Sequence, residues 1–189
     1  MSEARDIVEH LIEEGTAARA HFQVWWVLRN VAVPRLLSAM DHPAYVDFFH
    51  ASNSGHYKLF FIALSKIFDR DDRVAGISEL KKALRAEGRT DLALYIASEL
   101  KPIEQLVVRI MRIRDKSIAH TERRIPRTRV YKINGITPNQ IRQVIDQVCS
   151  VINHVARDLG ISNTIFQSAR LEEATLRMLE TLRRGIVDY

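Results

Sequence analysis

The chain has 189 residues, 27% of them charged, and a net charge of +5 at pH 7, values that fit an ordinary globular protein with one buried core. Its single cysteine, Cys149, excludes an internal disulfide framework and a cysteine-based zinc site, and we expect this side chain in the core. The sequence has no apolar run of about 18 residues and no signal-peptide pattern, so we expect a cytoplasmic protein that does not bind membranes.

Seven glycines and five prolines are few and favour long helices. Apolar residues at helical spacing predict the first helix over about residues 3–40, with Ser2 near its start as a candidate cap. Pro34 either kinks this helix or divides it into two pieces. Trp25 and Trp26 are expected to pack in the core or at an interface, and base stacking is the alternative.

A second helix is predicted over about residues 43–69, with Asp41 as its N-terminal cap. The stretch 52–55 (Ser-Asn-Ser-Gly) weakens the middle of this helix and leaves a break or bend open. An acid such as Asp69 at a helix C-terminus opposes the helix dipole. We therefore expect Asp69 to pair with a cation, either an arginine of the later segment 112–114 or an arginine next to it in the sequence.

The remaining helices are predicted, in chain order, over about residues 78–88, 90–120, 138–160 and 166–184. Pro102 either opens a new helix at its first turn or kinks a continuous one. Thr137 followed by Pro138 is a strong helix start. The stretch between residue 120 and Thr137 has no helical apolar spacing and is expected to be a basic loop, with a short extended piece near residues 129–133.

The helix expected to end near residue 120 carries an apolar stripe that runs into polar side chains. With Ile110 as the centre of the stripe, about 100° per residue places Ser117 roughly 20° to one side, Arg114 roughly 40° to the other and His120 roughly 80° away. Arginine is rarely placed on a buried face unless it is paired or lies at a cleft. The alternative is a structural Arg114 that caps carbonyl groups and a histidine that merely ends the helix.

Positive charge is concentrated beside these residues. The segment 109–132 holds nine bases but only two acids, Asp115 and Glu122. Such a patch would attract a polyanion and speed its arrival, whereas the alternative is a solvated basic loop. The bases are Arg109, Arg112, Arg114, Lys116, Arg123, Arg124, Arg127, Arg129 and Lys132.

Five residues separate Arg114 from His120, and this spacing resembles the signature of HEPN-domain ribonucleases, an arginine and a histidine four to six residues apart. A long first helix and the segment 60–71 (Phe-Phe-Ile-Ala-Leu-Ser-Lys-Ile-Phe-Asp-Arg-Asp) come before it, in the order typical of the AbiU-like abortive-infection branch. The resemblance covers roughly residues 1–160. It implies an all-α fold, a HEPN-like up-and-down helical bundle with long first helices, in one domain over residues 1–189.

A protein of this branch is expected to be a metal-independent endoribonuclease that needs no cofactor. It would cut RNA by attack of the 2′-OH on the adjacent phosphate, in phage defence, in abortive infection or as a toxin. His120 is the candidate general acid or base, and Arg114 the candidate clamp on the transition state. Asp115, Ser117 and Asp69 are expected to support them. The candidate RNA contacts are Lys116, Arg112, Arg123, Arg124, Arg127 and Arg129.

On one helix Arg114 and His120 lie about 120° apart, so a single copy presents them poorly to one phosphate. Members of the resembled family dimerise, and the resemblance implies a homodimer with a composite site; it also suggests an antitoxin or defence-system partner. The sequence departs from the family in two ways: Asp115 stands where many members carry Asn, and Thr121-Glu122 replaces the His-x-Tyr ending of the toxin subgroup. The alternative function is a non-catalytic HEPN-like helical dimer that binds RNA or nucleotide or is structural.

Overall fold

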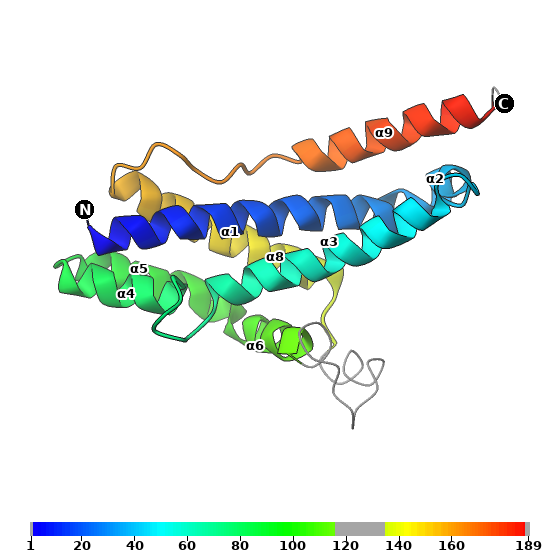
Figure 1. The fold of residues 1–189 in the computed structure, drawn as a ribbon. Helices are drawn as coiled ribbons and strands as arrows, with labels where there is room; N and C mark the ends of the chain where they lie inside the picture. Colours follow the sequence, from blue (N-terminus) through cyan, green and yellow to red (C-terminus); the bar gives the residue numbers. More distant parts are fainter. Residues whose placement is uncertain (1, 116–134, 188–189) are drawn as a thin grey trace. The chain divides into compact units, whose positions relative to one another are not determined.

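The computed structural model describes residues 2–115 and 135–187. These residues form helices and connecting turns without a strand, which confirms the predicted all-α fold (Figure 1). The elements are α1 (Glu3–Trp26), the π-helical turn η1 (Val27–Val31), α2 (Val33–Met40), α3 (Val46–Ile67), α4 (Ile77–Ala86), α5 (Thr90–Leu100), the 3₁₀ turn η2 (Lys101–Ile103), α6 (Glu104–Ile113), α8 (Pro138–Asp158) and α9 (Arg170–Val187).

The chain divides into two compact units. The first unit consists of Met1–Ala18 and Phe61–Gln167, and the second consists of Arg19–Phe60 and Ser168–Tyr189. Helices α1 and α3 each contribute residues to both units. That the whole chain forms a single domain stays a prediction.

In the first unit, α5 packs against both α4 and α8, and α6 also packs against α8. Helix α8 buries a long apolar face that includes Val144, Val148 and Ile152, and burying each such side chain stabilises the fold by about 1.5–3 kcal/mol. This helix begins where the sequence predicts. Thr137 caps it through a reciprocal pair of bonds, in which the Thr137 side chain accepts the Gln140 N–H at 3.3 Å and the Gln140 side chain accepts the Thr137 N–H at 2.9 Å.

Pro102 opens a new helix instead of kinking a continuous one. Helix α5 ends at Leu100, and Pro102 lies in the following 3₁₀ turn, after which α6 begins. Proline has no backbone N–H and its ring clashes with the preceding turn, so an α-helix cannot pass through it undisturbed. Ile103 is buried and anchors the turn, which sets the direction in which α6 leaves.

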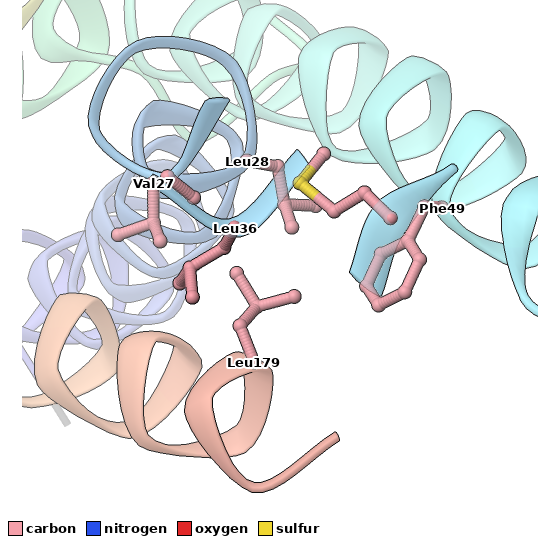
Figure 2. Packing of buried hydrophobic residues seen from close by; sticks show 7 residues of the cluster. Val27, Leu28, Leu36, Phe49 and Leu179 are labelled. Atoms are coloured by element: carbon pink, nitrogen blue, oxygen red, sulfur yellow. The ribbon is translucent and has the colours of Figure 1, made fainter. Parts of the chain in front are cut away.

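The second unit is built around an apolar cluster from η1, α2, α3 and α9. Figure 2 shows Leu179 of α9 beside Leu36 of α2, with Leu28 and Phe49 contributing to the same cluster. The first predicted helix is divided into pieces, which was one of the two alternatives for Pro34. This proline lies in the first turn of α2, where its missing N–H costs nothing.

Trp25 belongs to the core of the second unit, as expected. It is 8% exposed, and its ring centroid lies 5.6 Å from that of Tyr57 and 5.5 Å from that of Phe60. Aromatic pairs at such separations add to the stabilisation that comes from burial alone. A packing role therefore accounts for this tryptophan.

The predicted cap of α3 is wrong. Asp41 ends α2, where its N–H donates to the carbonyl oxygen of Leu37 at 2.8 Å, and α3 begins only at Val46. The residues between form a turn in which the His42 Nδ1 accepts the Ala44 N–H at 3.2 Å. The last helical bond of α2 thus uses the residue that the sequence pattern assigns to the start of the next helix.

Helix α3 passes through residues 52–55 without interruption. Phe49 and Phe60, one on either side of this stretch, are both buried. The packing of these side chains outweighs the low helix propensity of two serines, an asparagine and a glycine, which amounts to only about 1 kcal/mol per residue at most.

The last helix begins later than predicted, at Arg170 instead of about residue 166. The segment before it is not helical, and Asn153 of α8 holds its backbone at Ile165. The Asn153 Nδ2 donates to the Ile165 carbonyl oxygen at 2.8 Å, and the Asn153 Oδ1 accepts the Ile165 N–H at 2.7 Å. These two bonds fix an irregular connection inside the first unit.

Candidate active site

Helix α6 places Arg114 at its C-terminal end. Ile110 and Ile113 are fully buried, so the last turns of this helix are fixed against the core of the first unit. The N–H of Arg114 donates to the carbonyl oxygens of Ile110 and Met111, and residues 114 and 115 continue as a π-helical turn. Short π-helical segments frequently occur at functional sites.

The Arg114 side chain is 32% exposed and makes a direct ion pair with its neighbour. Its Nη1 donates to the Asp115 Oδ1 at 2.8 Å, while its Nε is buried and has no hydrogen-bond partner among the described residues. The expected face is therefore observed, since Arg114 is half-buried beside a buried apolar stripe. Asp115, one of the residues expected to support the site, pairs directly with Arg114.

A pocket of about 900 Å³ opens beside this pair in the first unit. The segment after α3 and the helices α4, α5 and α6, together with η2, supply its walls. Three of the predicted site residues line it, namely Asp69, Arg112 and Asp115. The structure thus brings the end of the α3 segment and the end of α6 to the same pocket, while the supporting role of Asp69 stays a prediction.

Asp69 reaches this pocket without the ion pair that the sequence suggested. Among the described residues it pairs with neither Arg112 nor Arg114, and its Oδ1 accepts the N–H of Asp71 at 3.0 Å. The adjacent ion pair is formed by Asp71 and Arg73 instead, at 2.6 Å, and it lowers the pKa of Asp71 to about 2. The turn after α3 is therefore stabilised locally.

Several predicted site residues lie outside the described residues, and the expected basic loop lies there too. They are Ser117, His120, Lys116, Arg123, Arg124, Arg127 and Arg129. The convergence of Arg114 and His120 on one phosphate stays a prediction.

Sequence reasoning did not find the other charged side chains of the pocket. Arg70, Lys81 and Lys101 line it from the turn after α3, from α4 and from the 3₁₀ turn. Lys81 and Lys101 belong to no motif, and Arg70, which lies within the segment 60–71, was considered only as a local partner for Asp69. No sequence signal marks the two lysines as pocket residues. The half-burial of Lys81 is known only from the packing of α4.

The described residues contain no cluster of three or more His, Cys, Asp or Glu side chains that could hold a metal ion. Nor does any helix in residues 2–115 or 135–187 have the length and apolar character needed to cross a bilayer.

Comparison with protein families identifies a family for this chain. The HEPN family model described as AbiU2 matches residues 1–176, which is most of the chain and includes both ends of the segment from Arg114 to His120. Comparison with curated proteins and with solved structures gives no match.

Proposed function

Because the chain belongs to the AbiU2 family of HEPN proteins, we propose that it is a metal-independent endoribonuclease that acts in phage defence or as a toxin. RNA can be cut without a metal when its own 2′-OH attacks the adjacent phosphate. This reaction needs a group that exchanges protons near neutral pH, and it needs fixed positive charge where negative charge builds up on the phosphate oxygens. The proposed products are a 2′,3′-cyclic phosphate and a free 5′-OH.

Arg114 is the proposed clamp on the phosphate, and the observation that carries the proposal is its position. Helix α6 buries Ile110 and Ile113, and this packing holds Arg114 half-buried at the helix end, beside a pocket. A guanidinium offers a planar pair of donors that matches two phosphate oxygens.

His120 is the proposed general acid or base, because an imidazole changes its charge near neutral pH. The proposed site is composite: two copies of the chain, related by two-fold symmetry, each contribute an Arg114 and a His120 to one cleft. This arrangement removes the geometric difficulty that the sequence predicts for a single copy, in which Arg114 and His120 would lie about 120° apart around one helix. RNA is the proposed substrate, and the bases between residues 109 and 132 are its proposed contacts.

Cleavage of a single-stranded RNA in the presence of EDTA tests this function. We expect Arg114→Ala and His120→Ala each to lower the cleavage rate by about 10²-fold or more. Arg114→Lys keeps the charge but loses the planar fork, so it should restore only part of the activity. Arg85→Ala, an exposed arginine at the end of α4, is the matched control and should cut like the parent. If Arg114→Ala and His120→Ala also cut like the parent, the assignment of the site is wrong.

A second function is favoured by one observation, the ion pair between Arg114 and Asp115. A carboxylate at 2.8 Å already occupies the guanidinium and adds negative charge where a phosphate would approach. A non-catalytic HEPN-like dimer that binds RNA or nucleotide would show binding that weakens with salt and no cleavage under any condition. A purely structural role would show instead as a large loss of thermal stability in Arg114→Ala without any RNA binding by the parent.

A further inference from the structure

The pocket beside Arg112 and Asp115 has the size of a ligand site. Its volume of about 900 Å³ lies in the upper part of the range of roughly 300–1,000 Å³ that is usual for small-molecule and cofactor sites. It is formed entirely by residues of the first unit. Nothing in the proposed chemistry at Arg114 uses the interior of this pocket, so it needs an explanation of its own.

One wall of the pocket is apolar. Phe68 and the α6 residues Val107, Val108 and Met111 are only half-buried, although all four are apolar and face the same pocket. Ile77 and Ile96 are buried behind them. An aromatic ring and a row of aliphatic side chains form a surface on which a flat ring system can stack.

The rim of the pocket carries more positive than negative side chains. Four cations line it, and none forms an ion pair with another described residue: Arg70, Lys81, Lys101 and Arg112. Three carboxylates also line it, but two are already engaged. Asp115 binds Arg114, and Asp69 accepts the N–H of Asp71. Glu104, the third of these carboxylates, has no such contact with another described residue.

We propose that this pocket binds one nucleotide, with the base against the apolar wall and the phosphate at the cationic rim. The combination of a ring-stacking surface and unpaired cations fits a nucleoside phosphate better than a purely apolar or a purely anionic ligand. The nucleotide can be part of the RNA, as the unpaired residue next to the linkage that is cut at Arg114. In that case the inference rests on the proposed function. A free mononucleotide has the same chemistry and would occupy the same pocket.

Filling the pocket tests the proposal. Ala97 lines it from α5, and Ala97→Trp would occupy the space intended for the base. Leu94 lies on the same helix, is 59% exposed and does not line the pocket, so Leu94→Trp is the matched control. The full chain is titrated with an uncleavable 2′-O-methyl single-stranded RNA and, separately, with each of the four nucleoside 5′-monophosphates. We expect Ala97→Trp to weaken binding of the RNA or of a mononucleotide by roughly tenfold, and Leu94→Trp to bind like the parent.

A second pair of variants tests the rim and does not depend on how tryptophan is tolerated. Lys81 lines the pocket, whereas its neighbour Lys82 pairs with Glu79 and does not. Lys81→Ala should weaken binding by about tenfold and reduce the slope of log affinity against log salt by about 1. Lys82→Ala removes the same charge one residue away and should leave both quantities unchanged.

The outcomes separate the source of the ligand and separate this proposal from the nuclease. If the parent binds mononucleotides and Ala97→Trp weakens that binding, the ligand is a free nucleotide. If the parent binds only the RNA and the same variant weakens that binding, the ligand is a residue of the substrate. Equal binding by the parent, Ala97→Trp and Lys81→Ala overturns the pocket even if Arg114→Ala stops cleavage. Loss of dimer in light scattering by Ala97→Trp, with unchanged nucleotide affinity, also overturns it, because the pocket would then be a contact between subunits. Conversely, pocket-dependent binding without any RNA cleavage leaves this proposal standing and refutes the nuclease.

Discussion

The guanidinium of Arg114 and the carboxylate of Asp115 are adjacent in the chain and lie 2.8 Å apart on a π-helical turn. Both side chains are partly exposed, 32% for Arg114 and 54% for Asp115. An ion pair with this exposure contributes little to stability, about 0–1 kcal/mol. Its larger effect is electrostatic, because the carboxylate reduces the positive potential that the arginine offers to an incoming phosphate.

We therefore expect Asp115→Asn to bind RNA more tightly. Removing the negative charge frees the guanidinium, and the gain should correspond to the strength of the exposed pair, roughly a two- to fivefold lower dissociation constant. The free energy of unfolding should change by less than about 1 kcal/mol. Fluorescence anisotropy with a labelled RNA measures the first quantity, and urea unfolding measures the second.

The control for this variant is Asp91→Asn, which removes the same charge from α5. The Asp91 side chain is 72% exposed, and its nearest cation, Arg89, is 3.8 Å away. Its substitution should leave RNA binding unchanged apart from a small effect of net charge. Binding by Asp115→Asn that is equal to or weaker than that of the parent would show that the carboxylate does not compete with the RNA.

The sequence predicts elements well where a local signal and the tertiary packing agree. Thr137 begins α8 as predicted, because its capping pattern and the apolar stripe that follows support the same helix. Arg114 is found half-buried beside Ile110 and Ile113, as their helical spacing predicts. Asp41 fails as a predicted cap because two helices compete for this residue, and the last turn of α2 wins.

The pocket could not be predicted from the sequence, and the reason is physical. Lys81 and Lys101 approach Arg112 only because α4, η2 and α6 pack around a common space. Such proximity depends on how helices pack, and no spacing within one helix encodes it. The Asp69 position was partly predictable: it reaches the expected neighbourhood, but an N–H of its own turn satisfies the carboxylate that was expected to bind an arginine.

Asn153 should be one of the least tolerant polar positions of the chain. It is 3% exposed and donates to and accepts from the backbone of Ile165. Asn153→Ala removes both partners and leaves a buried N–H and a buried carbonyl group without bonds, so we expect the free energy of unfolding to fall by about 2–5 kcal/mol. Asn139→Ala, an exposed residue in the first turn of the same helix, should change it by less than about 0.5 kcal/mol. Denaturant unfolding compares the two variants. Similar losses in both would show that the two bonds between Asn153 and the Ile165 backbone do not stabilise the fold.

Two glycines should respond to alanine with opposite signs. A Cβ atom on Gly76, the residue that precedes α4, would lie 2.8 Å from the carbonyl oxygen of Asp69, a backbone atom that can yield only if the turn moves. Gly76→Ala should therefore destabilise the protein by about 1–3 kcal/mol. A Cβ atom on Gly55, inside α3, meets nothing within 4 Å, so Gly55→Ala should stabilise the protein by about 0.5–1 kcal/mol. Thermal melts of both variants test the pair, and the same sign for both would refute the argument.

The stability of the protein should fall in mild acid because of two histidines in the second unit. The Nδ1 atoms of His21 on α1 and His56 on α3 lie 2.9 Å apart, close enough for one ring to donate to the other. Burial lowers the pKa of both rings, and the charge of His21 lowers the pKa of His56 further. The folded protein therefore takes up protons at lower pH than the unfolded chain, whose histidines titrate near pH 6.5.

The direction of the pH dependence follows from this difference. Above about pH 6.5 both states hold neutral rings, so the free energy of unfolding keeps its full contribution from the pair. As the pH falls below about 6.5, the unfolded chain binds protons that the folded protein resists, and the free energy of unfolding decreases. Urea unfolding between about pH 7.5 and pH 5 should show this decrease.

Two variants test whether the histidine pair causes it. His56→Gln removes one titrating ring and keeps an amide that can bond to His21, so its decrease in the free energy of unfolding should be smaller. His50 is an exposed histidine on the same helix, and His50→Gln should behave like the parent. An equal decrease in all three proteins would mean that other groups cause the acid sensitivity.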